Sequence, residues 1–408
     1  DALAAAGVNF ERAYTTVTTT TPSFASLLTS VYPSDHGVYS NTGRIDDRLV
    51  TLPEILGQHG WHTAAIVNLP WLNPDMSNIP QGIQELARCK HIRKADRTNR
   101  WILDFLDRRK EAGDQPFFLW VHYIDNHTPY HAPGKYARMY YPEGKDPRAG
   151  SSGSLQRAWK QFPEHHRDNP YFKKWLGGIT DADYVVAAYK GSGSWIDEHV
   201  GAVIARLKRN QQWENTLLVF LADHGESLGE HGLWFLHGGL YEPTARIPLI
   251  LRVPGGPAGR SVGAVVSQVD ILPTILARLG LPVPKQARGK DLWPLLGKRT
   301  LSGGAALLEH AGFYFVGVVT PRYKYIRHRS SRKVYPAYPM KRGREELYDL
   351  DKDPGEKTDI ARQSPDLLAE MRALLGKLKE GKSGEFEAAK AEVDEQTEEM
   401  LRSLGYTQ

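Results

Sequence analysis

The chain has 408 residues, of which 41% are hydrophobic and 24% charged, a composition typical of a soluble globular protein with one large and one smaller domain. Its formal net charge of +5 suits an anionic substrate, although an ordinary imbalance of surface charge explains it as well. A single cysteine, Cys89, excludes an intrachain disulfide. With no nucleic-acid motif and no apolar run near the roughly 20 residues of a membrane helix, we expect neither a nucleic-acid partner nor a membrane span in this chain.

Strand-like apolar runs alternate with helical patterns over the first two thirds of the chain. The predicted strands are short, apolar and bounded by polar or glycine-containing segments: 62–67, 117–123 and 216–223. The predicted helices between and around them are 23–32, 51–60, 100–111 and 183–210. This alternation predicts an α/β fold, a doubly wound sheet with helices on both faces.

Two further regions differ from this pattern in their composition. Residues 134–182 are polar and rich in glycine, proline and aromatic residues, and they form either a functional excursion over the site or a plain surface insertion. The β-prone pieces within 304–328 and 345–360 predict a small antiparallel sheet. We therefore expect a catalytic domain over 1–300 and a small C-terminal α+β subdomain over 301–408, closed by a helical tail over 365–405.

The first chemical motif is TTTTPSFASLLTSVYPSDHGV, residues 18–38. Pro22 suits a first helical turn, where no N–H donor is needed. The turn therefore presents Thr20 and free backbone N–H groups at a helix N-terminus, which favours anions. A threonine hydroxyl becomes a nucleophile there if a metal lowers its pKa, but a threonine beside a helix start is more commonly a cap.

The second motif is the polar loop that follows the strand 216–223. Asp223 and His224 stand at the carboxyl end of that strand, where open α/β sheets bind ligands, so the two side chains could share a metal ion. More groups of ligand type follow among closely spaced glycines: Glu226, Glu230, His231 and His237. Core packing does not explain such a loop, which indicates metal or phosphate chemistry.

The third motif is PFFLWVHYIDNHTPYHAP, residues 116–133, where a buried strand runs into polar residues at its end. The candidates here are His122, Asp125, His127 and His131. Spacing alone leaves His127 equally open as a catalytic acid or as a hydrogen-bonded loop histidine.

Together these segments resemble the sulfatase family of the alkaline-phosphatase-like superfamily. Residues 18–38 are similar to its Cys-x-Pro-Ser-Arg signature, and the later matches follow in the family's order: TLPEILGQHGWHTAAIV, PFFLWVHYIDNHTPY, LADHGESLGEHG, LYEPTARIPLIL, VDILPTIL, RYKYIRH and ELYDLDKDP. The resemblance implies the alkaline-phosphatase-like fold, a mixed sheet with helices on both faces.

The resemblance also implies a mechanism, in which a metal-activated nucleophile attacks sulfur or phosphorus in line. Matched residue by residue, it gives Thr20 the nucleophile position and makes Asp223 and His224, with Thr20, ligands of one divalent metal ion. His127 takes the position beside the leaving group. His237 stands where sulfatases have an oxyanion-binding lysine.

Departures from the family pattern change what we expect of the nucleophile and of the metal. Threonine at the signature position is not converted to formylglycine, so we expect no formylglycine here. Phe24 replaces the signature arginine, and 68–70 replace a Lys-Trp-His motif. The imidazole of His224 replaces an asparagine, which shifts the expected metal from Ca²⁺ towards Zn²⁺ or Mn²⁺.

The family's first strand carries one or two metal-ligand aspartates upstream of the helix with which this chain begins, and the sequence does not contain them. We therefore expect a missing N-terminal piece, an incomplete metal site, weak metal binding and low activity. For location, the sequence gives only a lean towards a periplasmic or secreted protein.

Three functions remain open from the sequence. The first is a metal-dependent hydrolase of a small sulfate or phosphate ester, carried on a glycan or lipid head group. The second is a phosphoethanolamine- or phosphoglycerol-type transferase, which the stretch DHGESLGEHGLWFLHG resembles. The third is a degenerate binding protein without catalysis. Side chains that could stack on a substrate, or simply pack, are Trp71, Asn73, Trp234 and Phe235.

Overall fold

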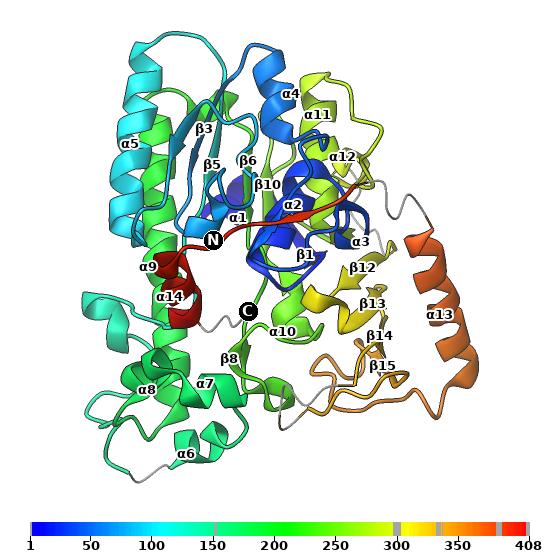
Figure 1. The fold of residues 1–408 in the computed structure, drawn as a ribbon. Coiled ribbons are helices and arrows are strands. Elements are labelled where there is room, and N and C mark those ends of the chain that lie inside the picture. Colours follow the sequence, from blue (N-terminus) through cyan, green and yellow to red (C-terminus); the bar gives the residue numbers. More distant parts are fainter. Residues whose placement is uncertain are drawn as a thin grey trace.

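The structure is a computed structural model that describes residues 2–150, 153–296, 303–331, 336, 338–380 and 386–404. Over these ranges, no helix combines the length and the apolar character needed to cross a membrane. The confirmed fold is a mixed α/β sheet with helices on both faces and a small antiparallel sheet beside it (Figure 1).

The large sheet lies in two sections. One is parallel, in the order β4 (Glu85–Ala87), β3 (His62–Ile66) and β5 (Phe117–Val121). The other is mixed, in the order β11 (Arg260–Ser267), β1 (Val8–Tyr14), β10 (Leu249–Arg252) and β6 (Leu218–Leu221), with β9 (Arg246–Ile247) paired to the end of β1. Strand β1 runs parallel to β11 and antiparallel to β10, which is antiparallel to β6.

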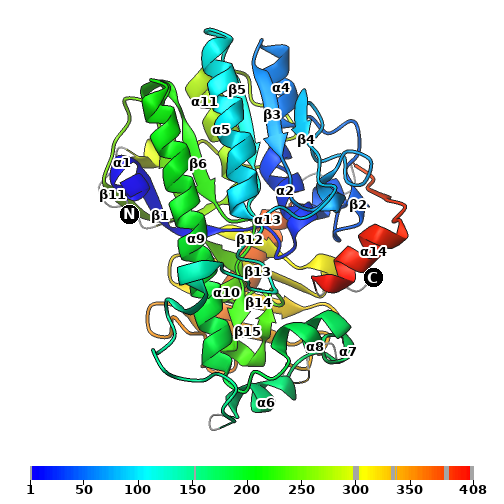
Figure 2. The same ribbon diagram turned by 90° about the vertical axis from the view of Figure 1, so that its left-hand side faces the viewer.

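Helices cover both faces of this sheet. One face carries α5 (Ala95–Glu111) and α9 (Ala182–Arg209), which pack on each other in front of the strands (Figure 2). The other face carries α2 (Thr20–Thr29), α4 (Leu52–Gln58) and α11 (Ile271–Leu279). Helix α4 begins where the sequence predicts, because Thr51 and Glu54 form a reciprocal capping box around its first turn.

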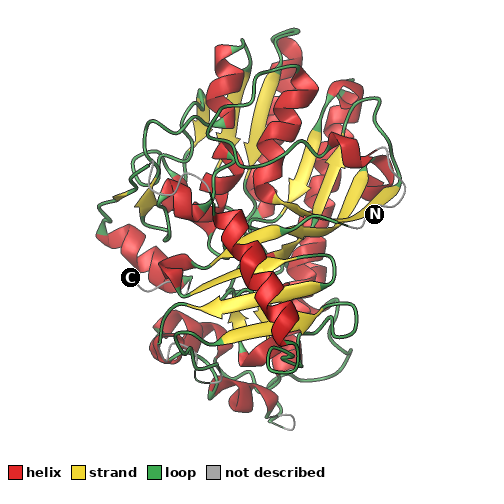
Figure 3. Cartoon of the chain, turned by 90° about the vertical axis from the view of Figure 1, so that its right-hand side faces the viewer, coloured by secondary structure: helices red, strands yellow, loops and turns green. Residues whose placement is uncertain are grey.

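The C-terminal sheet is antiparallel throughout, as predicted. Its order is β12 (Ala306–Glu309), β13 (Phe315–Val319), β14 (Tyr323–His328) and β15 (Glu345–Asp349). Helix α13 (Pro365–Lys379) crosses one face (Figure 3) and buries Met371 and Leu375 there. The predicted division between 1–300 and 301–408 stays a prediction, and its boundary lies outside the described residues.

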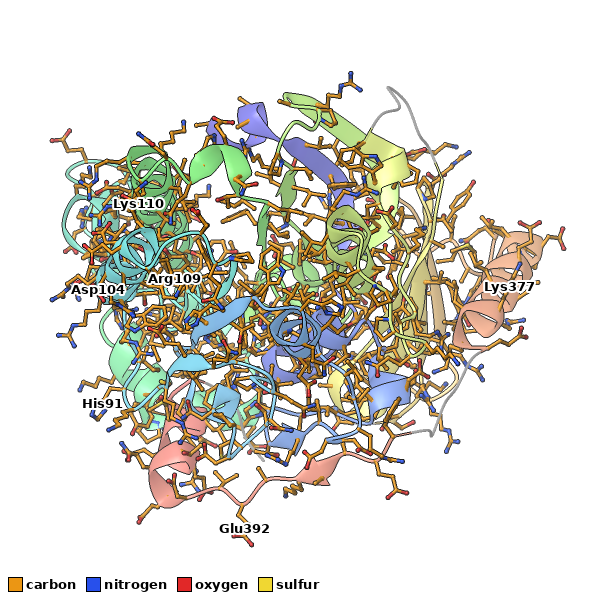
Figure 4. All side chains as sticks on the ribbon, turned by 90° about the horizontal axis from the view of Figure 1, so that it is seen from above. His91, Asp104, Arg109, Lys110, Lys377 and Glu392 are labelled. Atoms are coloured by element: carbon orange, nitrogen blue, oxygen red, sulfur yellow. The ribbon has the colours of Figure 1, made fainter. Side chains whose placement is uncertain are left out.

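The tail after α13 is not the continuous helix that the sequence predicts. Residues 386–394 are extended, β16 (Ala389–Lys390) pairs with β2 (Gly43–Arg44), and only α14 (Glu395–Ser403) is helical. Phe386, Ala388, Ala391 and Val393 of the extended part pack on the main core, whereas Glu392 is exposed (Figure 4). These core contacts and the pairing of β16 with β2 override the helical propensity of this charged segment.

The excursion 134–182 builds an aromatic cluster of its own beside the loop after β6. It contributes η2 (Gly134–Arg138), α6 (Ser154–Trp159), α7 (Glu164–Asp168) and α8 (Pro170–Leu176). Phe162 and Phe172 pack with Phe235, and the Trp234 Nε1 donates to Gln161 at 2.8 Å.

Of the predicted substrate-stacking residues, Trp71 and Phe235 have no exposed surface, so both serve packing. Asn73 is also buried, and its side chain bonds the backbone of Cys89.

Candidate active site

Thr20 occupies the first position of α2, as the Pro22 signal predicts. Helix α2 begins at Thr20 with Thr19 as its N-cap, and Pro22 lies in the first turn. The Thr20 side chain is almost fully buried and lines a cavity of about 1360 Å³. Its hydroxyl therefore stands at a helix N-terminus, in the positive end of the helix dipole.

Two side chains that sequence reasoning missed, Ser23 and Gln268, fix this turn. Ser23 Oγ donates to the backbone oxygen of Asp223 at 2.8 Å, which ties α2 to the end of β6. Gln268 Nε2 donates to the backbone oxygen of Ser23 at 2.6 Å, while its Oε1 accepts from the Thr16 backbone N–H at 3.0 Å. No local signal marks Gln268, because its role comes from the strand β11 that precedes it.

Asp223 and His224 meet Thr20 at the end of β6. Thr20 Oγ1 lies 3.4 Å from His224 Nε2, which is 3.5 Å from Asp223 Oδ2. The His224 Nδ1 lies 2.9 Å from the Gly225 carbonyl oxygen and so donates its proton there. In a neutral ring this leaves the lone pair on Nε2, directed at Thr20 and Asp223.

Gly225 is required where this turn begins. A Cβ atom there would lie 2.1 Å from the Pro243 carbonyl oxygen, a distance that no side chain tolerates. The close approach lets the Gly225 N–H donate to the Thr244 carbonyl at 2.8 Å. The glycine therefore holds the backbone that aims His224.

His127 and His237 complete a group of three imidazoles. The His237 ring centroid lies 4.4 Å from that of His224 and 5.6 Å from that of His127. His127 Nδ1 donates to the Thr128 carbonyl at 2.7 Å, so its neutral ring has the lone pair on Nε2. Burial is the main reason that the pKa of His127 is lowered to about 4 and that of His237 well below its usual value, and neighbouring imidazoles contribute to both shifts.

Phe24 stands where the family signature has an arginine, and it makes the adjacent wall apolar. Its ring lies 4.9 Å from that of Trp120 and 5.3 Å from that of His122. His122 Nδ1 accepts from the Asn68 N–H at 3.3 Å, and burial lowers the pKa of His122 to about 4. This side of the site therefore carries no cation at neutral pH.

Glu226 is the other predicted loop residue in the cavity wall. Its carboxyl group is buried near Tyr130 and Asp223, and burial raises its pKa well above the usual value.

The remaining candidates lie elsewhere. His231 stacks on Tyr241 at 3.6 Å and faces Glu356 at 3.8 Å, towards the C-terminal sheet. Glu230 accepts from the Leu228 N–H. Asp125 is buried near Trp195 and the start of α5, and neither it nor His131 lines the cavity.

The protein ligands for a metal are incomplete. Asp223 and His224 offer a carboxylate and an imidazole, but the described ranges contain no group of three or more His, Cys, Asp or Glu side chains placed to hold a metal ion. Catalytic sites for Zn²⁺ have three protein ligands, commonly including a carboxylate or several imidazoles. The described residues alone therefore do not fit a complete metal site.

The sequence matches the profile of the Sulfatase family over residues 1–281, more than half of the chain. The chain belongs to the sulfatase family. A second profile, described as the C-terminal part of N-sulphoglucosamine sulphohydrolase, matches residues 229–381. The predicted family is thus confirmed, and sulfatases of the alkaline-phosphatase superfamily generally use a divalent metal.

Known proteins similar to this chain are sulfatases and phosphonate hydrolases. The uncharacterized sulfatase YidJ of Escherichia coli is 28% identical over 337 residues, which are 72% of this chain and 64% of YidJ. The chain thus spans less than two thirds of that relative. A phosphonate monoester hydrolase of Agrobacterium radiobacter has the same fold, with a TM-score of 0.70 and 22% identity over 93% of this chain and 90% of that structure.

A third similar protein was solved with its substrate. The structure of BT4656 in complex with D-glucosamine-2-N,6-O-disulfate gives a TM-score of 0.69 and 20% identity, covering 94% of this chain and 93% of that structure. At this identity the likeness shows the fold. The family and these relatives support the predicted class of enzyme, an ester hydrolase.

Proposed function

We propose that the chain hydrolyses a sulfate or phosphate ester, with Thr20 as the nucleophile. The observation that carries the proposal is the distance of 3.4 Å between Thr20 Oγ1 and His224 Nε2 at the N-terminus of a helix. The first turn of α2 thus offers a nucleophilic hydroxyl and a site for an anion. The His224 lone pair beside it can take the proton of that hydroxyl.

The roles of the other residues follow from their protonation. The helix N-terminus attracts the anionic sulfuryl or phosphoryl group, and attack by Thr20 Oγ1 places new charge beside the imidazoles of His224 and His237. The proton that His224 takes from Thr20 would pass to the leaving oxygen as the ester bond to that oxygen breaks. His127 is neutral and lies on the other side of His237, so its Nε2 can relay that proton to the leaving oxygen, and water would then release the group from Thr20. Thr20, His127 and His237 are accordingly the proposed catalytic residues.

The metal assignment remains part of the proposal. His224 Nε2 lies 3.4 Å from Thr20 Oγ1 and 3.5 Å from Asp223 Oδ2, so these three atoms would hold a divalent ion. Such an ion would occupy the Nε2 lone pair and would activate the hydroxyl in place of the imidazole, by lowering its pKa, and it would polarise the ester. The imidazole favours Zn²⁺ or Mn²⁺ over Ca²⁺. One more oxygen ligand would complete the set.

The proposed substrate class is an anionic ester on a sugar. The glucosamine disulfate bound by BT4656 supports this proposal, as does the buried, polar end of the cavity at Thr20. The apolar wall formed by Phe24 offers no cation to a sulfate oxygen, which favours substrates whose charge is met by the helix N-terminus and the histidine group.

The test compares four esters with one protein: an aryl sulfate, a phosphate monoester, a phosphodiester and a phosphonate monoester, each with Zn²⁺, Mn²⁺ or Ca²⁺. Thr20→Ala should lower kcat by at least about 10³-fold on the preferred ester, because it removes the atom that attacks. Thr29→Ala is the matched control, since Thr29 lies at the other end of α2 and its hydroxyl donates within the same helix, to the Ala25 carbonyl. Full activity of Thr20→Ala would exclude the nucleophile.

A phosphoryl-alcohol transferase is the second candidate. The observation that favours it is the position of His237, which belongs to the Leu-His-Gly triplet and whose ring lies beside that of His224, at 4.4 Å between centroids. Product analysis with glycerol or a sugar alcohol present separates the two. Transfer of the group to the added alcohol in preference to water would support the transferase, and release to water alone would support the hydrolase.

A further inference from the structure

A group of buried polar atoms borders the proposed catalytic residues on the side of α9, the helix that runs from the excursion 134–182 to α5 (Figure 1). The group is made by the loop after β5, the middle of α9 and the loop after β6. Its members in the cavity wall are Asn126, Tyr189, Gly193 and Glu226. Asn126 directly precedes His127, so the group lies on the side of the site where the proposed function has the leaving oxygen.

Tyr130 joins this group beside the cavity wall. Its ring meets that of Tyr189 edge to face, with centroids 5.1 Å apart. Burial, and after it the nearby Glu226 carboxylate, raises the pKa of Tyr130 well above its usual value and that of Tyr189 to about 12. Both tyrosine hydroxyls therefore lie near Glu226, and the three side chains form one cluster.

Ser192 lies on the same face of α9, three positions after Tyr189 and four before Ile196, and both of these residues line the cavity. The Ser192 side chain is fully buried, and its Oγ has no hydrogen-bond partner among the described residues. A serine or threonine inside a helix often bonds the carbonyl four positions back, as Thr29 does with Ala25 at 2.6 Å. Because Ser192 neither makes that bond nor reaches solvent, its hydroxyl is available to a ligand.

Three more polar atoms of this group lack a partner. Within the described part of the chain, no side chain or backbone group is in hydrogen-bond geometry with Asn126 Oδ1, Tyr130 Oη or Glu226 Oε1. Tyr130 is 2% exposed and Glu226 is 7% exposed, so solvent does not replace the missing partners. A buried polar atom without a partner destabilises a folded protein, and several of them beside an active site indicate a place for a bound polar group.

Gly193 leaves room in front of Asn126. A Cβ atom at position 193 would lie 3.8 Å from Asn126 Oδ1, an ordinary contact distance, so packing does not require glycine there. At Gly191, by contrast, a Cβ atom would lie 2.1 Å from the Tyr136 carbonyl oxygen, and the close approach of η2 does require glycine. Glycine inside a helix lowers helix stability. The space that Gly193 leaves in the cavity wall is therefore the feature that this glycine provides.

We propose that these residues form a specificity pocket that recognises two neighbouring hydroxyl groups of the leaving alcohol. The proposal rests on the proposed function, in which the leaving oxygen lies beside His127. Asn126 Oδ1 and Glu226 Oε1 accept hydrogen bonds, whereas hydroxyl groups such as those of Tyr130 and Ser192 both donate and accept. A ligand hydroxyl also does both, so a pair of them suits this mixture. We call the set the hydroxyl pocket: Asn126, Tyr130, Tyr189, Ser192, Gly193 and Glu226.

The first test compares two esters of the acid that the chain prefers, a 2,3-dihydroxypropyl ester and a propyl ester. They differ only in the two hydroxyl groups, and the propyl ester would leave the buried atoms of the hydroxyl pocket unpaired. We expect kcat/KM to be at least about tenfold higher for the dihydroxypropyl ester. A 3-aminopropyl ester should do no better than the propyl ester. Equal kcat/KM for the dihydroxypropyl and propyl esters, or a preference for the aminopropyl ester, would overturn the proposal.

Ser192→Ala and Tyr130→Phe each remove one hydroxyl group. Each should reduce the preference for the dihydroxypropyl ester over the propyl ester at least about threefold. Neither should lower the urea midpoint, because the hydroxyl that is lost has no partner in the folded chain. Ser194→Ala is the matched control on the same helix, since the Ser194 hydroxyl lies 2.7 Å from that of Tyr140 in an exposed pair. A preference that stays unchanged in both Ser192→Ala and Tyr130→Phe would contradict the assigned contacts.

Gly193→Leu tests the space in the hydroxyl pocket. The added Cβ fits and leucine favours a helix, so the urea midpoint should not fall, whereas the preference for the dihydroxypropyl ester should drop at least about tenfold. Gly201→Leu, on the same helix where an added Cβ meets no other atom, should keep the preference. A Gly193→Leu protein that keeps it as well would also overturn the proposal.

Binding without turnover separates the hydroxyl pocket from the proposed function. Calorimetry with Thr20→Ala should show binding of the dihydroxypropyl ester at least about fivefold tighter than that of the propyl ester. Such a difference, with no hydrolysis by the unchanged chain, would reject the proposed function and support the hydroxyl pocket. Equal affinity for the two esters, with both hydrolysed at equal kcat/KM by the unchanged chain, would reject the hydroxyl pocket and leave the proposed function standing.

Discussion

Substitution of Lys324 tests how the C-terminal sheet is held to the catalytic part of the chain. Its side chain is fully buried on β14, with Nζ 2.6 Å from Glu242 Oε1 and 2.9 Å from Glu356 Oε1. Burial alone would lower the pKa of Lys324, but the two carboxylates raise it above the usual value, so the ammonium stays charged. Glu242 also accepts from the Tyr14 hydroxyl at 3.0 Å, which joins this charge group to β1.

Replacing Lys324 by methionine keeps the volume and removes the charge. Two buried carboxylates, one of them with no exposed side-chain surface, would then lose the cation that they share, and the Arg246 guanidinium, 3.7 Å from Glu242 Oε2, would still face Glu242. Breaking a buried ion pair in this way costs about 3–5 kcal/mol of the free energy of unfolding. Replacing Glu242 and Glu356 by glutamine in the same chain removes the stranded charges, so we expect the triple variant to recover at least about half of that loss.

Urea denaturation, followed by tryptophan fluorescence, measures the effect without adding salt. Lys135→Met is the matched control, because the Lys135–Glu198 pair is solvent-exposed with an N···O distance of 3.4 Å. That variant should leave the urea midpoint unchanged. A Lys324→Met protein within about 1 kcal/mol of the unchanged chain would refute the reasoning.

Two other perturbations follow from the structure. Gly225→Ala would force a Cβ atom against the Pro243 carbonyl oxygen, so we expect His224 to shift and kcat to fall at least about tenfold. The control is Gly201→Ala, at an exposed position of α9 where an added Cβ meets no other atom, and it should leave kcat unchanged. Burial lowers the pKa of His36 to about 3 and those of His122 and His310 to about 4, so between pH 6.5 and 4 the unfolded chain binds more protons than the folded one. Their contribution to the free energy of unfolding is full above pH 6.5 and is lost as the pH falls, by up to about 1.4 kcal/mol per pH unit for each histidine. Urea midpoints at pH 7 and pH 5 measure this loss. A higher midpoint at pH 5 would contradict the assignment of these histidines.

The sequence by itself determined most of the elements and the family. Strands β3, β5 and β6 and helices α4 and α9 lie where periodicity places them, because apolar runs and caps are local signals. Pro22 lies in the first turn of α2, as predicted, but the helix spans Thr20–Thr29 and so begins and ends three residues before the predicted 23–32. The order of the motifs then predicts the family that the profile over 1–281 confirms.

Tertiary structure decided which of the polar candidates meet. His127, His224 and His237 come together from two loops, whereas His231, from the same glycine-rich stretch, turns away to Tyr241 and Glu356. The sequence cannot separate these histidines, because all follow strands in polar loops and only the backbone path fixes their direction. Their roles as catalytic residues and metal ligands remain proposals.

Gln268 and the facing edges of β5 and β6 show what local sequence patterns do not predict. Gln268 orders the Thr20 turn from more than 240 positions away, through contacts that no motif encodes. The runs that form β5 and β6 predict strands buried on both faces. Helices do cover both faces, but Trp120 is the one buried residue of β5, and all four residues of β6 are only partly buried. Whether each edge has a neighbour depends on which strands pair, and pairing between distant segments is decided only when the sheet assembles.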